Sequence, residues 1–180
     1  MIETDRLILR NWRDADRAPY LDFCRSPAVM ACLGGPLTEA EVDAAIGRVR
    51  ASQDRNGFCL WAVERRADGA FLGYCGLKVA DTPGTPIEDE IEIGWRLGEF
   101  YWGRGYAREA AQASLRWAWA NLSTPRVIAI TVPTNRRSWG LMERIGMTRR
   151  PELDFGHPTF PENHPLHQHI SYAVDRPVAG

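Results

Sequence analysis

Hydrophobic and polar positions alternate along some segments of the chain and follow helical spacing along others, which predicts a mixed α/β protein. Leu7 and Leu9 fall on one face of a predicted strand at residues 6–10, and β-branched residues fill a predicted buried strand at residues 126–132. Further strands are predicted at residues 58–64, 70–78, 90–97 and 169–174. Helices are predicted at residues 14–24, just after Pro27, and at residues 38–52, 105–121 and 138–145.

Turn and cap residues support these boundaries. Thr38 and Glu41 match a capping box, Ala67 to Gly69 suits a hairpin turn, and Gly146 suits a helix end. The early strands can form an antiparallel meander, and a right-handed crossover then places strand 126–132 parallel to strand 90–97. We therefore expect a mixed sheet with helices on both faces, in a single domain over residues 1–180.

Composition narrows the class of protein. The 180 residues are 44% hydrophobic and 25% charged, with a formal net charge of -1, so no global field recruits nucleic acid or an anionic membrane. The N-terminus lacks a signal-peptide pattern, and no apolar run approaches the roughly 20 residues that span a bilayer. The four cysteines show no C-x-x-C pair, which predicts reduced thiols in a cytoplasmic protein.

A glycine-containing run at residues 101–109 opens the predicted helix at residues 105–121. Gly103 and Gly105 allow the backbone to approach a ligand closely, and free N–H groups at a helix start favour an anion. Arg104 and Arg108 add positive charge. The run predicts a phosphate or pyrophosphate site, although the glycines alone could also form a tight strand-to-helix turn.

Four motifs in this order resemble the GNAT superfamily of N-acetyltransferases, and within it the RimJ/RimL-like branch. They are Glu92–Trp95, Trp102–Ala107, Asn135–Ser138 with Glu143–Met147, and the opening Thr4–Arg10. The resemblance implies acetyl-CoA as co-substrate and a GNAT-like, mostly antiparallel sheet that splays between its two central parallel strands. Trp102 departs from the Gln or Arg that the family loop carries, a departure common in this branch.

The resemblance also implies which residues hold acetyl-CoA. The pyrophosphate would lie on the backbone of Gly103, Arg104, Gly105, Tyr106, Ala107 and Arg108. The pantetheine arm would pair with the strand ending Trp95, Arg96 and Leu97, where an N–H near Trp95 would polarise the thioester carbonyl. Asn135 would lie on the far wall of the cleft, but it also suits a simple turn before the next helix.

An acceptor amine is protonated near neutral pH, so the reaction needs a base. Alternation places Glu90, Glu92 and Gly94 on one strand face, and Glu92 is the candidate base. The alternatives are a solvated acidic strand end or an ion pair with a nearby arginine.

The leaving thiolate needs a proton or a hydrogen bond. Many family members use a tyrosine at the position that Met142 occupies, so Ser138 is the candidate substitute. Ser138 could equally serve as the N-cap of the short helix.

The tail at residues 154–169 contains all four histidines. It is similar to a late active-site loop of the branch, so Asp154 or His157 could position or deprotonate the amine; a plain surface loop is the alternative. We expect no metal site, because acidic and cysteine ligands are missing around the histidines. Aromatic residues near Trp12 and the early helices could shape the acceptor pocket.

Together these features predict an acetyl-CoA-dependent N-acetyltransferase that moves acetyl directly to a primary amine, either a protein N-terminus or a small molecule. A mildly acidic protein suits a cationic acceptor. The rival class is a non-catalytic acetyl-CoA-binding module, in which Met142 marks a lost acid. A nucleotide-binding role is disfavoured because no Gly-Lys-Ser/Thr pattern follows the loop. The expected partners are acetyl-CoA and an amine, without nucleic acid or membrane, in a monomer or homodimer.

Overall fold

The computed structural model of the chain describes residues 1–178. The strands are β1 (Ile2–Glu3), β2 (Leu7–Arg10), β3 (Leu60–Arg65), β4 (Phe71–Val79), β5 (Ile91–Leu97), β6 (Arg126–Thr131), β7 (Thr148–Arg149), β8 (Phe155–Gly156) and β9 (Gln168–Asp175). The α-helices are α1 (Arg17–Arg25), α2 (Pro27–Met30), α3 (Glu39–Asn56), α4 (Tyr106–Asn121) and α5 (Arg136–Arg144). Short 3₁₀ turns lie at Asp14–Asp16, Glu99–Tyr101 and Pro151–Leu153.

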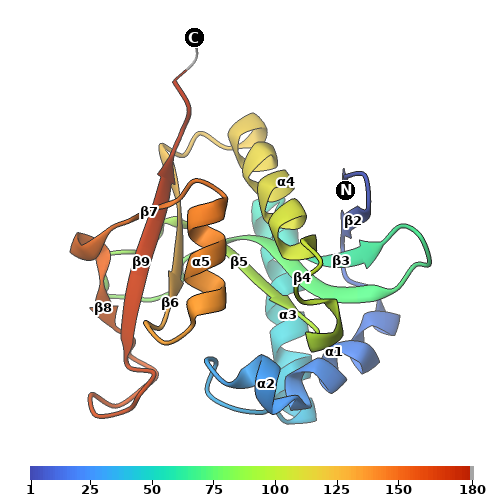
Figure 1. Ribbon diagram of the computed structural model, residues 1–180, viewed down its shortest axis with the longest axis horizontal. Coiled ribbons are helices and arrows are strands. Elements are labelled where there is room, and N and C mark those ends of the chain that lie inside the picture. Colours follow the sequence, from blue (N-terminus) through green and yellow to red (C-terminus); the bar gives the residue numbers. More distant parts are fainter. Residues whose placement is uncertain (179–180) are drawn as a thin grey trace.

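Within the described residues, the strands form a nine-stranded sheet in the order β1-β2-β3-β4-β5-β6-β9-β7, and β8 pairs with β9. Neighbouring strands are antiparallel, except that β5 and β6 are parallel, as the crossover through α4 requires (Figure 1). The predicted mixed, mostly antiparallel sheet is therefore confirmed.

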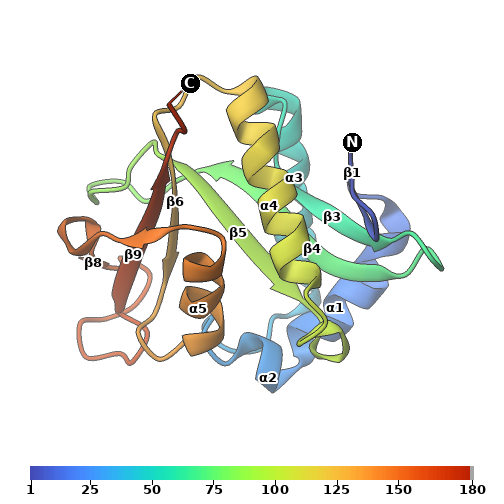
Figure 2. The ribbon, with the colours of Figure 1, turned by 45° about the horizontal axis from the view of Figure 1, so that its top comes forward.

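The parallel pair is the feature that positions the site. β5 and β6 share a single register pair, Glu92 with Ile128. Beyond that pair the two strands diverge, which both views show as a widening angle between the ribbons (Figures 1 and 2). The splay that was expected between the central strands is present, and it begins at Glu92.

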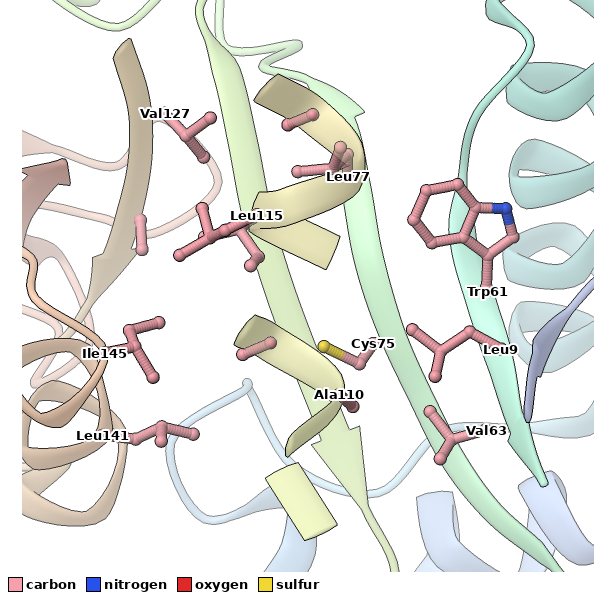
Figure 3. Packing of buried hydrophobic residues seen from close by; sticks show 14 of the residues in the cluster. Leu9, Trp61, Val63, Cys75, Leu77, Ala110, Leu115, Val127, Leu141 and Ile145 are labelled. Atoms are coloured by element: carbon pink, nitrogen blue, oxygen red, sulfur yellow. The ribbon is translucent and has the colours of Figure 1, made fainter. Parts of the chain in front are cut away.

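Two hydrophobic clusters attach the helices to opposite faces of the sheet. α4 and α5 pack on one face, where residues such as Cys75, Leu77, Ala110 and Leu115 interdigitate (Figure 3). α1–α3 pack on the other face, with Tyr20 and Val42 against β3 and β4. None of the helices in residues 1–178 is long and apolar enough to cross a bilayer.

Several local predictions are confirmed. Thr38 and Glu41 exchange capping-box bonds, in which the Glu41 carboxylate accepts from the Thr38 N–H at 2.7 Å and the Thr38 hydroxyl accepts from the Glu41 N–H at 3.3 Å. Gly69 takes a positive φ of 71° in the β3–β4 turn. The two-residue strands β1, β7 and β8 were not predicted, because they are too short to show a period-2 pattern.

Candidate active site

A cleft runs between β5 and β6 with a volume of ≈ 1980 Å³, larger than the roughly 300–1,000 Å³ typical of a pocket for one small ligand. The cleft is lined by the starts of α4 and α5, by the diverging half of β5, and by side chains of α1–α3. The cleft therefore has room for two molecules at once, one approached from each face of the sheet.

The loop at the start of α4 has the geometry of an anion site. Gly103 and Gly105 take positive φ values of 73° and 80°, and Gly105 is the N-cap of α4. Within residues 1–178, none of the N–H groups of Gly103–Arg108 donates a hydrogen bond to the protein. A series of unpaired donors at the positive end of a 16-residue helix fits a pyrophosphate group.

Ion-pair contacts from the N-terminal segment hold this loop in place. The Glu109 carboxylate accepts hydrogen bonds from the Thr4 hydroxyl at 2.6 Å, the Arg6 N–H at 3.0 Å and Arg6 Nε at 2.6 Å. Arg6 Nη1 also donates to the Arg104 carbonyl at 3.0 Å. Burial acts to raise the pKa of Glu109, but the bonds from Thr4 and Arg6 outweigh it and hold that pKa below its usual value.

This clamp of Thr4, Arg6 and Glu109 was not predicted, although each of its members belongs to a segment that the sequence singled out. The contacts join residues about a hundred positions apart, so local patterns could not show them. Their effect is to fix the loop backbone before any ligand arrives.

Trp102 packs the loop against the end of β5. Its Nε1 donates to the Leu97 carbonyl at 2.8 Å, and the Arg137 guanidinium lies 4.6 Å from its ring centroid. Trp102 thus links β5 to the first turn of α5, which an indole can do through both its N–H and its ring face.

The start of α5 forms the far wall of the cleft. The helix begins at Arg136, and its N-cap is Asn135, whose side-chain oxygen accepts from the Ser138 N–H at 3.4 Å. Asn135 Nδ2 donates to Thr131 Oγ1 at 3.0 Å, which ties the end of β6 to the helix. The alternative in which Ser138 is the N-cap is therefore wrong, because Asn135 takes that position three residues before the expected helix start.

Ser138 lines the cleft from the first turn of α5. Its hydroxyl forms no side-chain hydrogen bond within the described part of the chain. Met142 also lines the cleft but is 1% exposed and packs into the core. The hydroxyl of Ser138 is thus available to a bound thiol, whereas the Met142 thioether carries no proton to donate.

The end of β5 presents a free backbone edge to the cleft. Trp95, Arg96 and Leu97 all line it, and their other edge is paired with β4. No register pair joins this stretch to β6, since the described pairing stops at Glu92. An extended arm can therefore pair with the free edge, as expected from the resemblance, while the Arg96 side chain points toward α1.

Glu92 lies where the strands part, is 7% exposed, and lines the cleft. Its Oε2 is 3.2 Å from Lys78 Nζ as an ion pair, without hydrogen-bond geometry. Burial raises the pKa of Glu92, opposed in part by the charge of Lys78. A raised pKa makes this carboxylate a better proton acceptor.

Lys78 bridges two carboxylates, because its Nζ also donates to Asp81 Oδ1 at 3.0 Å. Burial acts to lower the pKa of Lys78, but Glu92 and Asp81 outweigh it and raise that pKa to about 12. The arginine ion pair considered for the acidic strand end belongs instead to Glu90, which pairs with Arg126.

The tail is attached to β9 and reaches the cleft through one histidine. Asp154 pairs with Arg149 and accepts from the Ser171 N–H at 2.9 Å. These contacts occupy its carboxylate, and Asp154 and His157 both lie outside the cleft lining. His169 lines the cleft, and burial lowers its pKa so that the imidazole is neutral at pH 7.

In residues 1–178 no group of three His, Cys, Asp or Glu side chains is placed to hold a metal ion. Among the aromatic residues near the early helices, Trp12, Tyr20 and Tyr74 line the cleft from the α1–α3 side. The side of the cleft that faces α1–α3 is therefore aromatic, and the side at the start of α4 is lined by backbone N–H groups.

Comparison with known proteins decides the family. A model described as an acetyltransferase (GNAT) domain matches residues 6–148, most of the chain. The chain belongs to the GNAT acetyltransferase family. It is of the RimJ/RimL type, and the enzyme is an acetyl-CoA-dependent N-acetyltransferase.

The chain is also similar to individual proteins over most of their length. The chain is 30% identical over 145 residues to the uncharacterised protein YkkB of Bacillus subtilis, covering 80% of this chain and 83% of that one. It is 31% identical to the acetyltransferase structure from Agrobacterium tumefaciens, with a TM-score of 0.79 over 96% of this chain and 92% of that one.

The fold is also similar to that of RimL, an α-N-acetyltransferase of ribosomal protein L7/L12 solved in complex with coenzyme A. That match has a TM-score of 0.74 at 14% identity, over 96% of this chain and 95% of that one. The likeness concerns the fold alone, and acetyl-CoA as the family's co-substrate agrees with the unpaired donors of the α4 loop.

Proposed function

We propose that this N-acetyltransferase passes acetyl directly from acetyl-CoA to a primary amine while both are bound in the cleft. The N–H groups of Gly103–Arg108 would hold the pyrophosphate, and the free edge at Trp95–Leu97 would hold the pantetheine arm. Acetyl-CoA supplies an activated acyl thioester. The cleft volume and its two-sided lining support simultaneous binding of donor and acceptor.

Glu92 would take the proton that the amine must lose. As the amine nitrogen bonds to the acetyl carbon, the carbon–sulfur bond breaks and the thiolate leaves. The raised pKa of Glu92 and its place at the splay support this role. The Ser138 hydroxyl, on the opposite wall, would donate a hydrogen bond to the departing sulfur.

The observation that carries the proposal is the row of unpaired N–H groups beside the diverging strands. The test is release of free thiol from acetyl-CoA with a panel of amines, with the acetylated product identified by mass spectrometry. Direct transfer predicts intersecting initial-velocity lines when both substrates are varied. Parallel lines would indicate an acetyl-enzyme and contradict the proposal, and tight acetyl-CoA binding without turnover would favour a binding module.

A further inference from the structure

Arg96 is a largely buried cation that lacks an acidic partner. Its Nη1 donates to two neutral acceptors, the Tyr20 hydroxyl at 3.2 Å and Cys24 Sγ at 3.5 Å. Its Nε is fully covered and has no hydrogen-bond partner, and Nη2 makes no hydrogen bond within residues 1–178. No carboxylate of the described residues forms an ion pair with it.

The contrast with two other largely buried cations makes this unusual. Lys78 is neutralised by Glu92 and Asp81, and the buried Arg10 on β2 has Asp16 and Glu64. A buried charge normally has such partners, because removing it from water is costly. Nε and Nη2 of Arg96 instead remain without acceptors in the described part of the chain. In arginine these two groups form one edge of the guanidinium, and that edge can bind a carboxylate through two parallel hydrogen bonds.

The surroundings of Arg96 place it on the acceptor side. Its guanidinium lies 5.5 Å from the Tyr74 ring and 6.0 Å from the Tyr20 ring, on the face of the sheet that α1–α3 cover. The α4 loop covers the other face, so the donor phosphates lie elsewhere. Arg96 and Glu92 share one strand face, four residues or about 13 Å apart along the strand.

We propose that Arg96 binds a carboxylate of the acceptor, so that the acceptor is a small amine that also carries a carboxylate, of the amino-acid class. This proposal rests on the proposed function, because it assumes that the amine reacts near Glu92. The aromatic rings of Tyr20 and Tyr74 form the walls of the carboxylate site. Nε is covered by its neighbours, so a carboxylate that engages both donors must displace part of that covering.

The test compares matched acceptors. Because Glu92 and Arg96 lie about 13 Å apart along the strand, ω-amino acids of increasing length, from glycine to 8-aminooctanoic acid, and lysine are paired with their carboxamides, at equal concentrations of free amine. The wild-type enzyme should favour the carboxylate of at least one pair by about 10- to 100-fold in kcat/KM, the range of a charged hydrogen-bonded pair. Phosphoethanolamine tests a phosphate in place of the carboxylate. A higher kcat/KM for phosphoethanolamine than for every amino acid would overturn the carboxylate assignment.

Two variants attribute the preference to this residue. Arg96→Met should abolish this preference, so that kcat/KM falls much further for the carboxylates than for the carboxamides. Arg96→Lys should retain part of the preference, because the charge remains without the planar fork. Arg55→Met, at an exposed arginine of the same cleft, should leave it unchanged. An equal loss for acids and amides in Arg96→Met, or no preference in the wild type, would overturn the proposal.

A binding measurement separates this proposal from the proposed function. N-acetyl amino acids, as product mimics, should raise the melting temperature of the wild type more than their amides do, and Arg96→Met should lose the difference. If that holds while no amine releases thiol, the proposed function fails and the carboxylate site stands. If thiol is released but acids and amides stabilise equally, the carboxylate site fails alone.

Discussion

Gly105→Val tests whether the loop before α4 binds the pyrophosphate or is only a turn. Gly105 has φ of 80°, and Gly69, in the β3–β4 turn outside the cleft lining, has φ of 71°. Valine at either position enters a left-handed conformation that costs L residues about 1–2 kcal/mol. Both variants should therefore lose similar stability, a fall of about 2–8 °C in melting temperature for a chain of this size.

The effect on acetyl-CoA affinity should differ sharply between the two variants. At Gly105 the new methyl groups lie beside the unpaired N–H groups, and a built Cβ already meets Arg6 Nη2 at 3.4 Å. A hydrogen bond to a charged group contributes about 1.5–3 kcal/mol. Loss of two such bonds weakens binding by about 3–6 kcal/mol, or about 10²- to 10⁴-fold in Kd.

The assay is isothermal titration of each variant with acetyl-CoA, with melting curves as the measure of folding. Gly69→Val should bind like the wild type, since nothing lies within 4 Å of its Cβ. If Gly105→Val binds acetyl-CoA within about threefold of Gly69→Val, the glycines serve only the turn and the pyrophosphate assignment is refuted.

Three further predictions concern charges around the cleft. Glu92→Gln should lower kcat/KM about 10²-fold or more near pH 7, and by less near pH 9.5, where more of the amine is already the free base. The control variant Glu90→Gln should have little effect. An equal loss of kcat/KM at both pH values would exclude a base role for Glu92. Lys78→Met removes the positive charge 3.2 Å from the Glu92 carboxylate, so the pKa of Glu92 should rise. The acidic limb of the pH–rate profile should then move to higher pH, and a shift to lower pH would contradict the pairing. Glu109→Gln should raise the Kd for acetyl-CoA about tenfold through a looser loop, whereas Asp175→Asn, which removes an ion pair with Arg150 outside the cleft lining, should not. Equal Kd values for the two variants would show that the clamp has no such role.

The long helices and strands could be predicted because their hydrophobic periodicity and their cap and turn residues are local features of the sequence. The start of α5 could not, since Asn-Arg-Arg-Ser offers two residues that favour the N-cap. The hydrogen bond from Asn135 back to Thr131 decides between them, and that bond depends on where β6 ends. Local sequence therefore limits a helix boundary to a few residues, and tertiary contacts determine the exact one.

The proposed donor half of the site can be derived from the sequence for the same reason. A pyrophosphate cradle consists of backbone groups, and two glycines at a helix start encode it within a few residues. The acceptor half depends on side chains brought together from distant segments. Arg96 meets Tyr20 across 76 positions, and Lys78 meets Glu92 only through the β4–β5 register. No pattern along the chain shows which of these charges is left without a partner.

The net charge of -1 favours a cationic acceptor, yet the structure points to a different criterion for the acceptor. A net charge acts at long range through screened solvent, where two unit charges 4 Å apart interact by about 1 kcal/mol. A partly buried charge interacts by about 4 kcal/mol at the same distance. Arg96 is such a charge, and in the described residues no carboxylate neutralises it. The local charge of Arg96 in the cleft therefore outweighs the net charge of the protein in selecting the acceptor. In the proposed acceptor, the amine would react near Glu92 and the carboxylate would bind Arg96.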